Sequence, residues 1–453
     1  MSGPERMTTP NPREFILRGP IVSGLLKLGL PTLVVITVQT LVGVAEAYFV
    51  SFLGTDALAG VAVVFPVQML MQMMANGGFG QGVASAIARA LGGKRRDDAV
   101  ALAFHALVLA AVLGTAFMAA ALAGGPYLYR AMGAEGGALE AALTFSNITF
   151  LGAIPFWMMA LLAAVLRGSG EVRAPAIIAF TGAVVLVALS PALIFGFGPL
   201  PRLGVAGGAA ANALFAAVST IALLVYLRTR AGLKLGVAPM RWRLFKDILG
   251  VGTLSAVSTI QTNLTVALVT GAVGLYGTAA IAGYGIASRL DYLLIPLMFG
   301  FGTASVTMVG TAIGAGDIDR ARRVAWVAAA MGAVVTGVIG VTVAIFPTLW
   351  LGLFTSDPAV LATGTQYLRI VAPFYVFFGA GMMIYFSSQG AQRVLLPVIG
   401  GTARLVLAGL VGWYAAARFG LDLAALFAIV AVSHVIFCAV GSLSLRNWVP
   451  KKG

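Results

Sequence analysis

The sequence predicts an all-α integral membrane protein with about twelve transmembrane helices, arranged as two pseudo-symmetric six-helix bundles. Of the 453 residues, 60% are hydrophobic and only 10% are charged, and the mean hydropathy is +0.99. A typical soluble domain is about a quarter charged. Apolar runs recur along the whole chain, and many exceed the ~20 residues that cross a hydrocarbon core. A set of short motifs also occurs twice, at one constant spacing.

The apolar segments give the predicted helices in order. They are continuous rather than alternating, and backbone groups in lipid must be satisfied within the chain, so helices are favoured over a barrel. Six segments lie in the first half, at 21–53, 57–92, 98–124, 138–166, 174–198 and 204–228. Six more lie in the second half, at 247–276, 279–313, 321–353, 362–388, 397–417 and 422–445.

The positive charges lie mostly on one side of this predicted bundle. The 29 Lys and Arg residues are concentrated in the N-terminal tail and in every second loop, where Arg167 is one of them. The loops of the opposite side carry only Arg130, Arg202 and Arg418. By the positive-inside rule, both termini are cytoplasmic in a plasma membrane, or in the inner membrane of a Gram-negative cell. The same distribution explains the pI of about 10.3 without nucleic acid as a partner.

Two further features limit the class of protein. Residues 1–20 contain no short apolar core followed by a cleavage site, so we expect no signal peptide and a retained first span. The single cysteine, Cys438, excludes an intramolecular disulfide and any site with several cysteine ligands.

The chain repeats itself at an offset of 222 residues. Gly78-Phe79-Gly80 recurs as Gly300-Phe301-Gly302, and the same offset links Gln39-Thr40 with Gln261-Thr262, Gly92 with Gly314, Gly168 with Gly390, and Pro175 with Pro397. These matches indicate duplication of a six-helix unit. Because six is even, both copies enter the membrane in the same direction, and parallel repeats of this kind hold substrate between them. The predicted parts are a cytoplasmic tail (1–20), an N-lobe (21–228), a cytoplasmic linker (229–246), a C-lobe (247–446) and a C-terminal tail (447–453).

Several loose motifs in a specific order carry a resemblance to a known family. They are Leu26-Lys27-Leu28-Gly29-Leu30-Pro31-Thr32, Phe49-Val50-Ser51-Phe52-Leu53-Gly54-Thr55-Asp56-Ala57-Leu58-Ala59, Ile87-Ala88-Arg89-Ala90-Leu91-Gly92, and Leu166-Arg167-Gly168-Ser169-Gly170 with Arg173 and Pro175. In both halves the chain resembles the multidrug and toxic-compound extrusion (MATE) transporters. The resemblance implies two lobes that form a V around a central cavity, and alternating access driven by proton or sodium antiport. It also implies export of small amphipathic organic compounds, often cationic, by a protein that we expect to be a monomer in membrane lipid.

Glu46 is the first candidate for coupling. An ionisable side chain inside the bilayer is costly unless it is paired or hydrated, so each one is a candidate for the mechanism. Glu46 lies eight residues before Gly54, about 12 Å along the first span from its outer end. A carboxyl at that depth can alternate between binding a proton and binding a cation. The resemblance implies a coupling role at this position, where the family usually has an aspartate. The alternative is a structural pair or a side chain that reaches the membrane surface.

Asp291 is the second candidate, and it lies beside Arg289 in the eighth span. Residues at i and i+2 do not share a helix face, so we expect that the two side chains do not neutralise each other. A coupling or gating role and a purely structural ion pair are both open for Asp291.

The chain also departs from the family pattern. Many relatives carry an acid where Ser190 stands, and one branch has a glutamate in the seventh helix, where this chain reads Gln261-Thr262-Asn263. The tenth span has no acid beyond Asp357 at its mouth. Coupling therefore depends mainly on Glu46, and a proton is favoured over sodium, which needs several oxygen ligands. We expect no cofactor, and a metal ligand only if Glu46 binds sodium.

Polar and soft apolar side chains are the candidates for the cavity wall. Gln68, Gln72 and Asn76 recur at i, i+4 and i+8 and so share one face of the second helix. Hydrogen bonding between helices is the alternative for the amides, and plain packing is the alternative for the methionines. The predicted cavity residues are Gln39, Gln68, Gln72, Asn76, Gln261, Asn263, Met73 and Met298.

Other classes of protein fit the sequence less well. A flippase for lipid or lipid-linked oligosaccharide, from the same superfamily, should show extra spans or a cationic cavity. A membrane enzyme would need clustered Asp, His or metal motifs, whereas His105 and His434 stand alone and are expected to be packing residues. Arg404 is expected to stabilise its lobe. A passive channel is disfavoured by the duplicated halves.

Overall fold

The computed structural model describes residues 12–197, 201–230, 236 and 238–448, and these residues form helices, turns and short connections without a strand. The predicted tails at 1–20 and 447–453 and the predicted linker at 229–246 therefore lie partly outside the described residues. Within the N-terminal tail, residues Pro12–Arg18 form the short helix α1.

The N-lobe contains eight α-helices and one wide helical turn among its described residues. They are α2 (Ile21–Ser51), α3 (Thr55–Gln72), η1 (Met73–Phe79), α4 (Gly80–Gly92), α5 (Arg96–Ala131), α6 (Gly136–Leu151), α7 (Ala153–Gly168), α8 (Arg173–Phe195) and α9 (Val205–Thr229).

The C-lobe follows the same plan. Its described elements are α10 (Trp242–Gly274), α11 (Thr278–Gly314), α12 (Ile318–Ile345), α13 (Thr348–Leu351), α14 (Pro358–Val371), η2 (Ala372–Phe374), α15 (Tyr375–Gly390), α16 (Leu395–Arg404), η3 (Leu405–Val411), α17 (Gly412–Phe419), α18 (Leu423–Leu443) and η4 (Ser444–Asn447). Because α10 begins at Trp242, the last residues of the predicted linker are helical.

The prediction of about twelve membrane helices is confirmed. Among the described residues, 11 helices are long and apolar enough to cross a membrane, and α6 with α7 makes a twelfth span if this bent pair is counted as one. The pair bends by 48° at Gly152, where the sequence predicted one continuous helix over 138–166. Two other predicted spans contain π-helical turns, at Met73–Phe79 and Leu405–Val411.

Acidic side chains begin several helices at the membrane boundary. The Asp357 carboxylate accepts hydrogen bonds from the backbone N–H groups of Ala359 and Val360, at 2.8 and 3.3 Å. Asp317 and Asp422 cap α12 and α18 in the same way. A capping side chain satisfies N–H groups that the helix leaves free. Asp357 at the mouth of the tenth span is therefore a helix cap.

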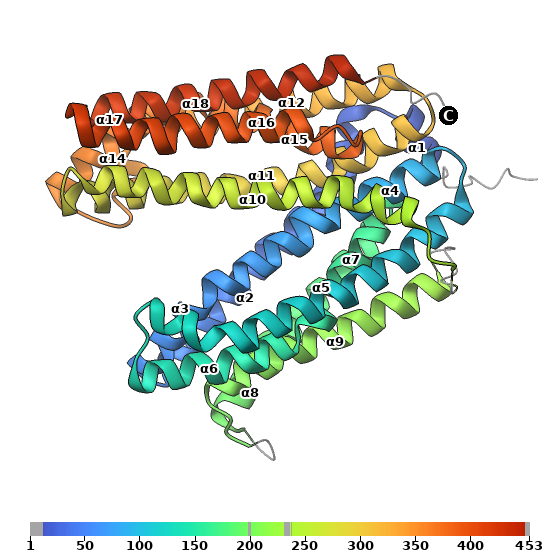
Figure 1. Ribbon diagram of the computed structural model, residues 1–453, viewed down its shortest axis with the longest axis horizontal. Coiled ribbons are helices and arrows are strands. Elements are labelled where there is room, and N and C mark those ends of the chain that lie inside the picture. Colours follow the sequence, from blue (N-terminus) through green and yellow to red (C-terminus); the bar gives the residue numbers. More distant parts are fainter. Residues whose placement is uncertain (1–11, 198–200, 231–235, 237, 449–453) are drawn as a thin grey trace, which may run out of the picture.

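The two lobes form a V, as the resemblance implied (Figure 1). α2 to α9 make one arm and α10 to α18 the other, and the arms meet where α11 packs against α2 and α4. The end at which they meet also carries α1, η4 and the start of α5, and we call it the closed end. The opposite end, with α13, α14 and α17, is the open end.

The contacts at the closed end repeat between the lobes. A Cβ atom on Gly92 would lie 2.1 Å from the carbonyl oxygen of Thr311, and a Cβ atom on Gly314 would lie 2.1 Å from that of Arg89. The offset of 222 converts the first pair into the second. Glycine is required at both positions because the two backbones touch there.

Two hydrogen bonds between the lobes obey the same relation. Ser85 Oγ donates to the carbonyl oxygen of Gln389 at 2.5 Å, and Thr307 Oγ1 donates to that of Arg167 at 3.0 Å. Ser85 maps onto Thr307, and Gln389 maps onto Arg167, by the offset of 222. The lobes therefore meet about a pseudo-twofold axis, as duplication of a six-helix unit predicts.

Ionic contacts fasten the described end of the linker to the N-lobe. Asp98 near the start of α5 pairs with Arg95 at 2.8 Å, Arg243 at 3.0 Å and Arg241 at 3.9 Å. His105, which is fully buried, accepts the backbone N–H of Arg241 at 2.9 Å through Nε2. His105 is therefore a satisfied structural residue, as expected, and it also holds the beginning of α10.

Candidate functional site

A cavity of about 740 Å³ lies between the lobes. Its walls come from α2, α3, η1, α6, α7, α8 and α9 of the N-lobe and from α10, α11, α15, α16 and α18 of the C-lobe. Along α2 it extends from Thr32 to Val50, about 27 Å of helix. This central cavity has the size of sites that hold organic molecules.

The structure brings seven of the eight predicted cavity residues to this wall. They are Gln39, Gln68, Gln72, Met73, Asn76, Gln261 and Asn263. Within the described part of the chain, the side chains of Gln39, Gln68 and Gln72 make no hydrogen bond, so they do not serve as links between helices. Gln261 does form such a link, because its Nε2 donates to Thr402 Oγ1 at 2.8 Å.

Met298 is the exception, and its prediction as a cavity residue is wrong. The side chain is fully buried, in an apolar cluster with Phe301 and Leu25. On α11 the cavity is lined by Tyr292, Ile295 and Phe299, which follow a helical period. Met298 points away from that face and packs between the helices.

Glu46 faces the central cavity from α2. It shares one helix face with Gln39, Gly43 and Val50, which also line the wall. The amide Nδ2 of Asn212, on α9, donates a hydrogen bond to Glu46 Oε1. Glu46 is the only Asp or Glu on the described part of the wall. The sequence analysis missed Asn212, although an amide within the apolar run 204–228 could have drawn attention to it.

Ser190 does not contribute an oxygen to this wall. Its side chain is fully buried in α8, and its hydroxyl has no hydrogen-bond partner among the described residues. Gly208 on α9 is its neighbour: an added Cβ there would lie 3.8 Å from the Ser190 hydroxyl. The described cavity wall therefore has one acid, Glu46, whereas relatives with an acid at the position of Ser190 have a second acid in this lobe.

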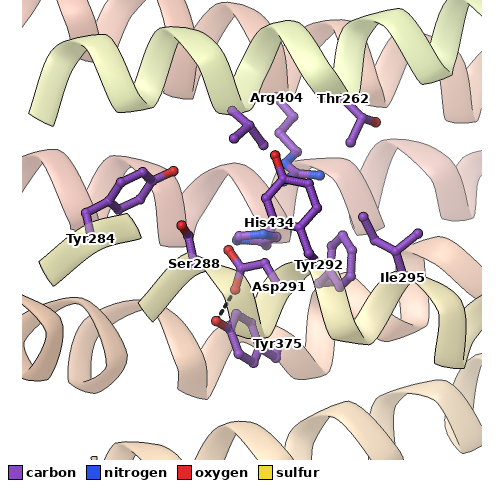
Figure 2. A pocket seen from close by; sticks show the side chains of 11 residues that line it. Thr262, Tyr284, Ser288, Asp291, Tyr292, Ile295, Tyr375, Arg404 and His434 are labelled. Carbon is purple, nitrogen blue, oxygen red and sulfur yellow. Dashed lines mark hydrogen bonds between the residues drawn. The ribbon is translucent and has the colours of Figure 1, made fainter. Parts of the chain in front are cut away.

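Asp291 lies in a second, smaller pocket inside the C-lobe, about 30 Å³ in volume (Figure 2). Its carboxylate accepts a hydrogen bond from the Tyr367 hydroxyl at 2.5 Å and another from the Tyr375 hydroxyl. Arg289 does not neutralise it, as predicted from the spacing. The Arg289 guanidinium lies instead over the ring of Phe354, 5.7 Å from its centre.

Arg404 and His434 line the same C-lobe pocket as Asp291 (Figure 2). The Arg404 guanidinium lies 5.4 Å from the ring centre of Phe378, and Arg404 also reaches the wall of the central cavity. His434 is buried and meets Phe378 edge-on, at a centroid distance of 5.5 Å. The two residues expected to stabilise and pack the lobe thus also surround an acid.

Arg167 was expected in a cytoplasmic loop, and the structure corrects this. It lies in the last turn of α7 and lines the central cavity. The wall therefore carries one carboxylate and two guanidinium groups among its described residues. No cluster of three or more His, Cys, Asp or Glu side chains suited to a metal ion occurs in the described ranges.

Sequence comparison supplies the family. A family model described as MatE matches residues 31–193 and 255–414, which is more than half of the chain. The chain is 27% identical over 383 residues to the probable multidrug resistance protein NorM of Thermotoga maritima, covering 83% of this chain and 81% of that protein. It is 26% identical over 404 residues to an FAD transporter of Shewanella oneidensis, covering 87% and 88%.

Solved structures agree with this. A MATE crystal structure in the bent conformation matches with a TM-score of 0.88 at 26% identity, over 97% of both chains. An outward-facing multidrug resistance MATE transporter of the MOP superfamily matches with a TM-score of 0.84 at 26% identity, over 97% of this chain and 98% of the other. The chain belongs to the MatE family of multidrug efflux transporters.

Proposed function

We propose that this transporter exports amphipathic organic compounds, with cations as the expected class, by alternating access in exchange for protons. The observation that carries the proposal is the carboxylate of Glu46 on the wall of a cavity that both lobes enclose. A charged Glu46 attracts a cationic cargo, whereas a protonated Glu46 does not. Binding of a proton and binding of cargo therefore exclude each other, which is the requirement for antiport.

The surroundings of Glu46 favour a proton over sodium. A hard cation such as sodium prefers several oxygen ligands. Asn212 turns its amide nitrogen, not its oxygen, toward the carboxylate, and Ser190 is buried away from the wall. Glu46 would be a metal ligand only in a sodium-coupled cycle.

The side of release follows from the charge distribution. Arg95 directly precedes α5, Arg96 is its first residue, and Arg320 and Arg322 lie in the first turns of α12, all at the closed end. The positive-inside rule assigns this end to the cytoplasm. The cavity would then open to the outside, in the state that releases cargo and takes up a proton from the plasma membrane's outer side.

Asp291 is the second candidate for coupling. Its pocket contains a cation, Arg404, that also reaches the central cavity. A change of charge at Asp291 would therefore change the electrostatic potential at the cavity wall. The hydroxyls of Tyr367 and Tyr375 donate hydrogen bonds to the Asp291 carboxylate. Glu46 is the principal site because it faces the cavity directly.

Transport by purified protein in liposomes tests this proposal. With the cytoplasmic end facing the medium, a pH gradient that is acidic on the other side should drive accumulation of a cationic dye in the lumen. Glu46→Gln should abolish proton-driven transport, because the amide cannot change its charge, while thermal stability stays close to wild type. Glu46→Asp, the matched control that keeps the acid, should retain activity.

Two results would overturn parts of the proposal. Transport that requires sodium and does not respond to a pH gradient would reverse the choice of ion. Dye transport that is unchanged in Glu46→Gln would remove Glu46 as the coupling site. The alternative function, flipping of a lipid or lipid-linked oligosaccharide, would be favoured if a labelled lipid, and no dye, crossed the same membranes.

A further inference from the structure

Arg167 occupies a cavity-facing position at the end of α7. Phe156, Ala160, Ala163 and Arg167 all line the central cavity, and their spacing of four, three and four residues defines one face of the helix. Arg167 is the only charged residue of that face. Its position is thus set by the helix and not by a loop.

The charge of Arg167 has no partner in the described structure. Its Nε and Nη2 atoms are buried and form no hydrogen bond there, and none of the four ion pairs among the described residues includes it. The carbonyl end of α7 is a favourable neighbour, but a helix end is worth only about 0.3–1 kcal/mol to a cation. Removing an ion from water costs several kcal/mol. The site therefore lacks one negative charge.

Arg404, the other guanidinium of the wall, also has a buried Nε without a hydrogen bond in the described structure, but its charge has a different environment. It shares the C-lobe pocket with Asp291 and lies over the ring of Phe378. Glu46, the carboxylate on the cavity wall, accepts the amide of Asn212. Among the charged residues of the described wall, the Arg167 side chain alone has neither a hydrogen bond nor a ring contact.

We propose that Arg167 binds an anionic group of the cargo, such as a carboxylate, a phosphate or a sulfonate. The inference deepens the proposed function and rests on it, because it assigns to the central cavity a second subsite in addition to Glu46. The cavity wall that carries both subsites is largely apolar, with Phe65, Met159 and Phe299 among its residues. The cargo class is thus zwitterionic amphipathic molecules, with a cationic group for Glu46 and an acidic group for Arg167.

The location of Arg167 suits uptake from the closed end. The Arg167 carbonyl accepts the Thr307 hydroxyl across the lobe interface, so separation of the lobes at that end must expose this turn of α7. Cargo that enters from that side would meet the guanidinium first. Its planar fork of donors is suited to two-point binding of a carboxylate or phosphate.

Equilibrium binding to purified wild-type protein in a neutral detergent gives the first test. The probes are a cationic rhodamine-type dye with a free carboxylate and the methyl ester of the same dye, in which a methyl group replaces the negative charge. Anisotropy titrations should show at least about tenfold tighter binding of the carboxylate form, as expected for a charge-assisted hydrogen bond in a cavity. Equal affinity for the two probes would overturn the proposal without any variant.

Variants give the second test. Arg167→Gln should remove the preference for the carboxylate form, and Arg167→Lys should restore part of it, because lysine keeps the charge without the fork. Arg418→Gln, an exposed arginine at the open end, is the matched control and should behave as wild type. An unchanged preference in a folded Arg167→Gln protein would overturn the assignment to Arg167.

A competition experiment distinguishes a lipid headgroup from a soluble cargo as the source of the anionic group. The design also separates failure of this inference from failure of the proposed function. Displacement of the carboxylate dye by phosphatidylglycerol, but not by phosphatidylcholine, would support the site with a lipid headgroup as its ligand. Resistance to both lipids would support it with a soluble cargo. Because no gradient is used, failure of proton-driven export in liposomes would leave the binding result intact, and the reverse also holds.

Discussion

Glu46 and Asn212 form the contact on which the pH dependence of transport should depend. The Asn212 amide donates to the carboxylate, and a donor stabilises the charged form over the protonated form. Asn212→Leu removes this donor, so the protonated form of Glu46 becomes more populated relative to the charged form. We predict that the pH of half-maximal dye export rises by about one to two units, from the ~1.5–3 kcal/mol of a hydrogen bond to a charged group.

The control for this shift is another amide of the cavity wall. Asn263 donates to the carbonyl of Thr259 at 2.8 Å and does not contact Glu46. Asn263→Leu should change the dye affinity at most and leave the pH midpoint in place. A midpoint that stays constant or falls in Asn212→Leu would show that this amide does not stabilise the charged carboxylate.

The hydrogen bond between Tyr367 and Asp291 should stabilise the folded protein. Tyr367→Phe deletes one of the two hydroxyl groups that the buried carboxylate accepts, and a buried acceptor that loses a donor costs about 1–3 kcal/mol. We predict a lower thermal unfolding temperature for Tyr367→Phe, and a much smaller effect of the same change in an Asp291→Asn background. Such a double-mutant cycle isolates the pair.

Tyr292→Phe serves as the matched control, since Tyr292 lines the same pocket and is 44% exposed. It should unfold at the wild-type temperature. If Tyr367→Phe destabilised the protein equally with and without the Asp291 carboxylate, the tyrosine would act through packing alone.

Between helices, the glycine contacts of the closed end hold the lobes together. A methyl group on Gly92 or Gly314 would lie 2.1 Å from a backbone oxygen of the other lobe, so alanine at either position must push the lobes apart. We predict that Gly92→Ala and Gly314→Ala increase the population open at this end. Spin-label distances across the closed end in liposomes would measure that population.

Gly285→Ala provides the comparison, because an added Cβ at this helical position meets nothing within 4 Å. Alanine is the better helix former by about 1 kcal/mol, so this variant should keep the wild-type distances and be at least as stable. Unchanged distances in both Gly92→Ala and Gly314→Ala would contradict the prediction, because the added methyl groups would then be accommodated by local adjustment without separation of the lobes.

Hydropathy and repetition predicted the helices and their division into lobes, because both are properties of whole segments. The direction of a side chain depends on helix phase, which a bend or a wide turn changes. The bend at Gly152 and the π turn at Met73–Phe79 leave no clear mark in an apolar run. On α11, the helix phase directs Met298 into the core. α7 continues to Gly168, so Arg167 lies on the cavity wall and not in a loop.

Hydrogen-bond partners that are distant along the chain could also not be predicted from the sequence. Asn212 meets Glu46 over a separation of 166 residues, and Tyr375 meets Asp291 over 84. Both acids were identified as candidates because a charge in an apolar span is costly. Their partners are ordinary polar residues, which gain meaning only when the helices are assembled.

In the whole molecule, a symmetric scaffold carries an asymmetric set of charges. The contacts of the closed end follow the offset of 222, but the charged residues of the two pockets do not. Glu46 and Arg167 correspond to Leu268 and Gln389 in the C-lobe. Asp291 and Arg404 correspond to Met69 and Gly182 in the N-lobe. The duplicated contacts thus join the two arms, whereas each lobe carries its own set of charged residues.

The orientation of the V in the membrane gives the last prediction. In a background with Cys438→Ala, a cysteine in place of Leu353 reports on the open end, and one in place of Asp97 reports on the closed end. Both positions are exposed, Leu353 to 73%. The positive-inside rule requires that a membrane-impermeant maleimide labels Leu353→Cys in intact cells and labels Asp97→Cys only after permeabilisation.

The labelling pattern also determines which half of the transport cycle the structure represents. If Leu353→Cys reacts from outside, the cavity of about 740 Å³ is open to the exterior, and the contacts of Gly92 and Gly314 are the barrier toward the cytoplasm. The opposite pattern would contradict the charge rule and turn the same contacts into the outer barrier. Glu46 would then collect its proton from the cytoplasm, and exchange of cargo for an external proton would require the opposite conformation.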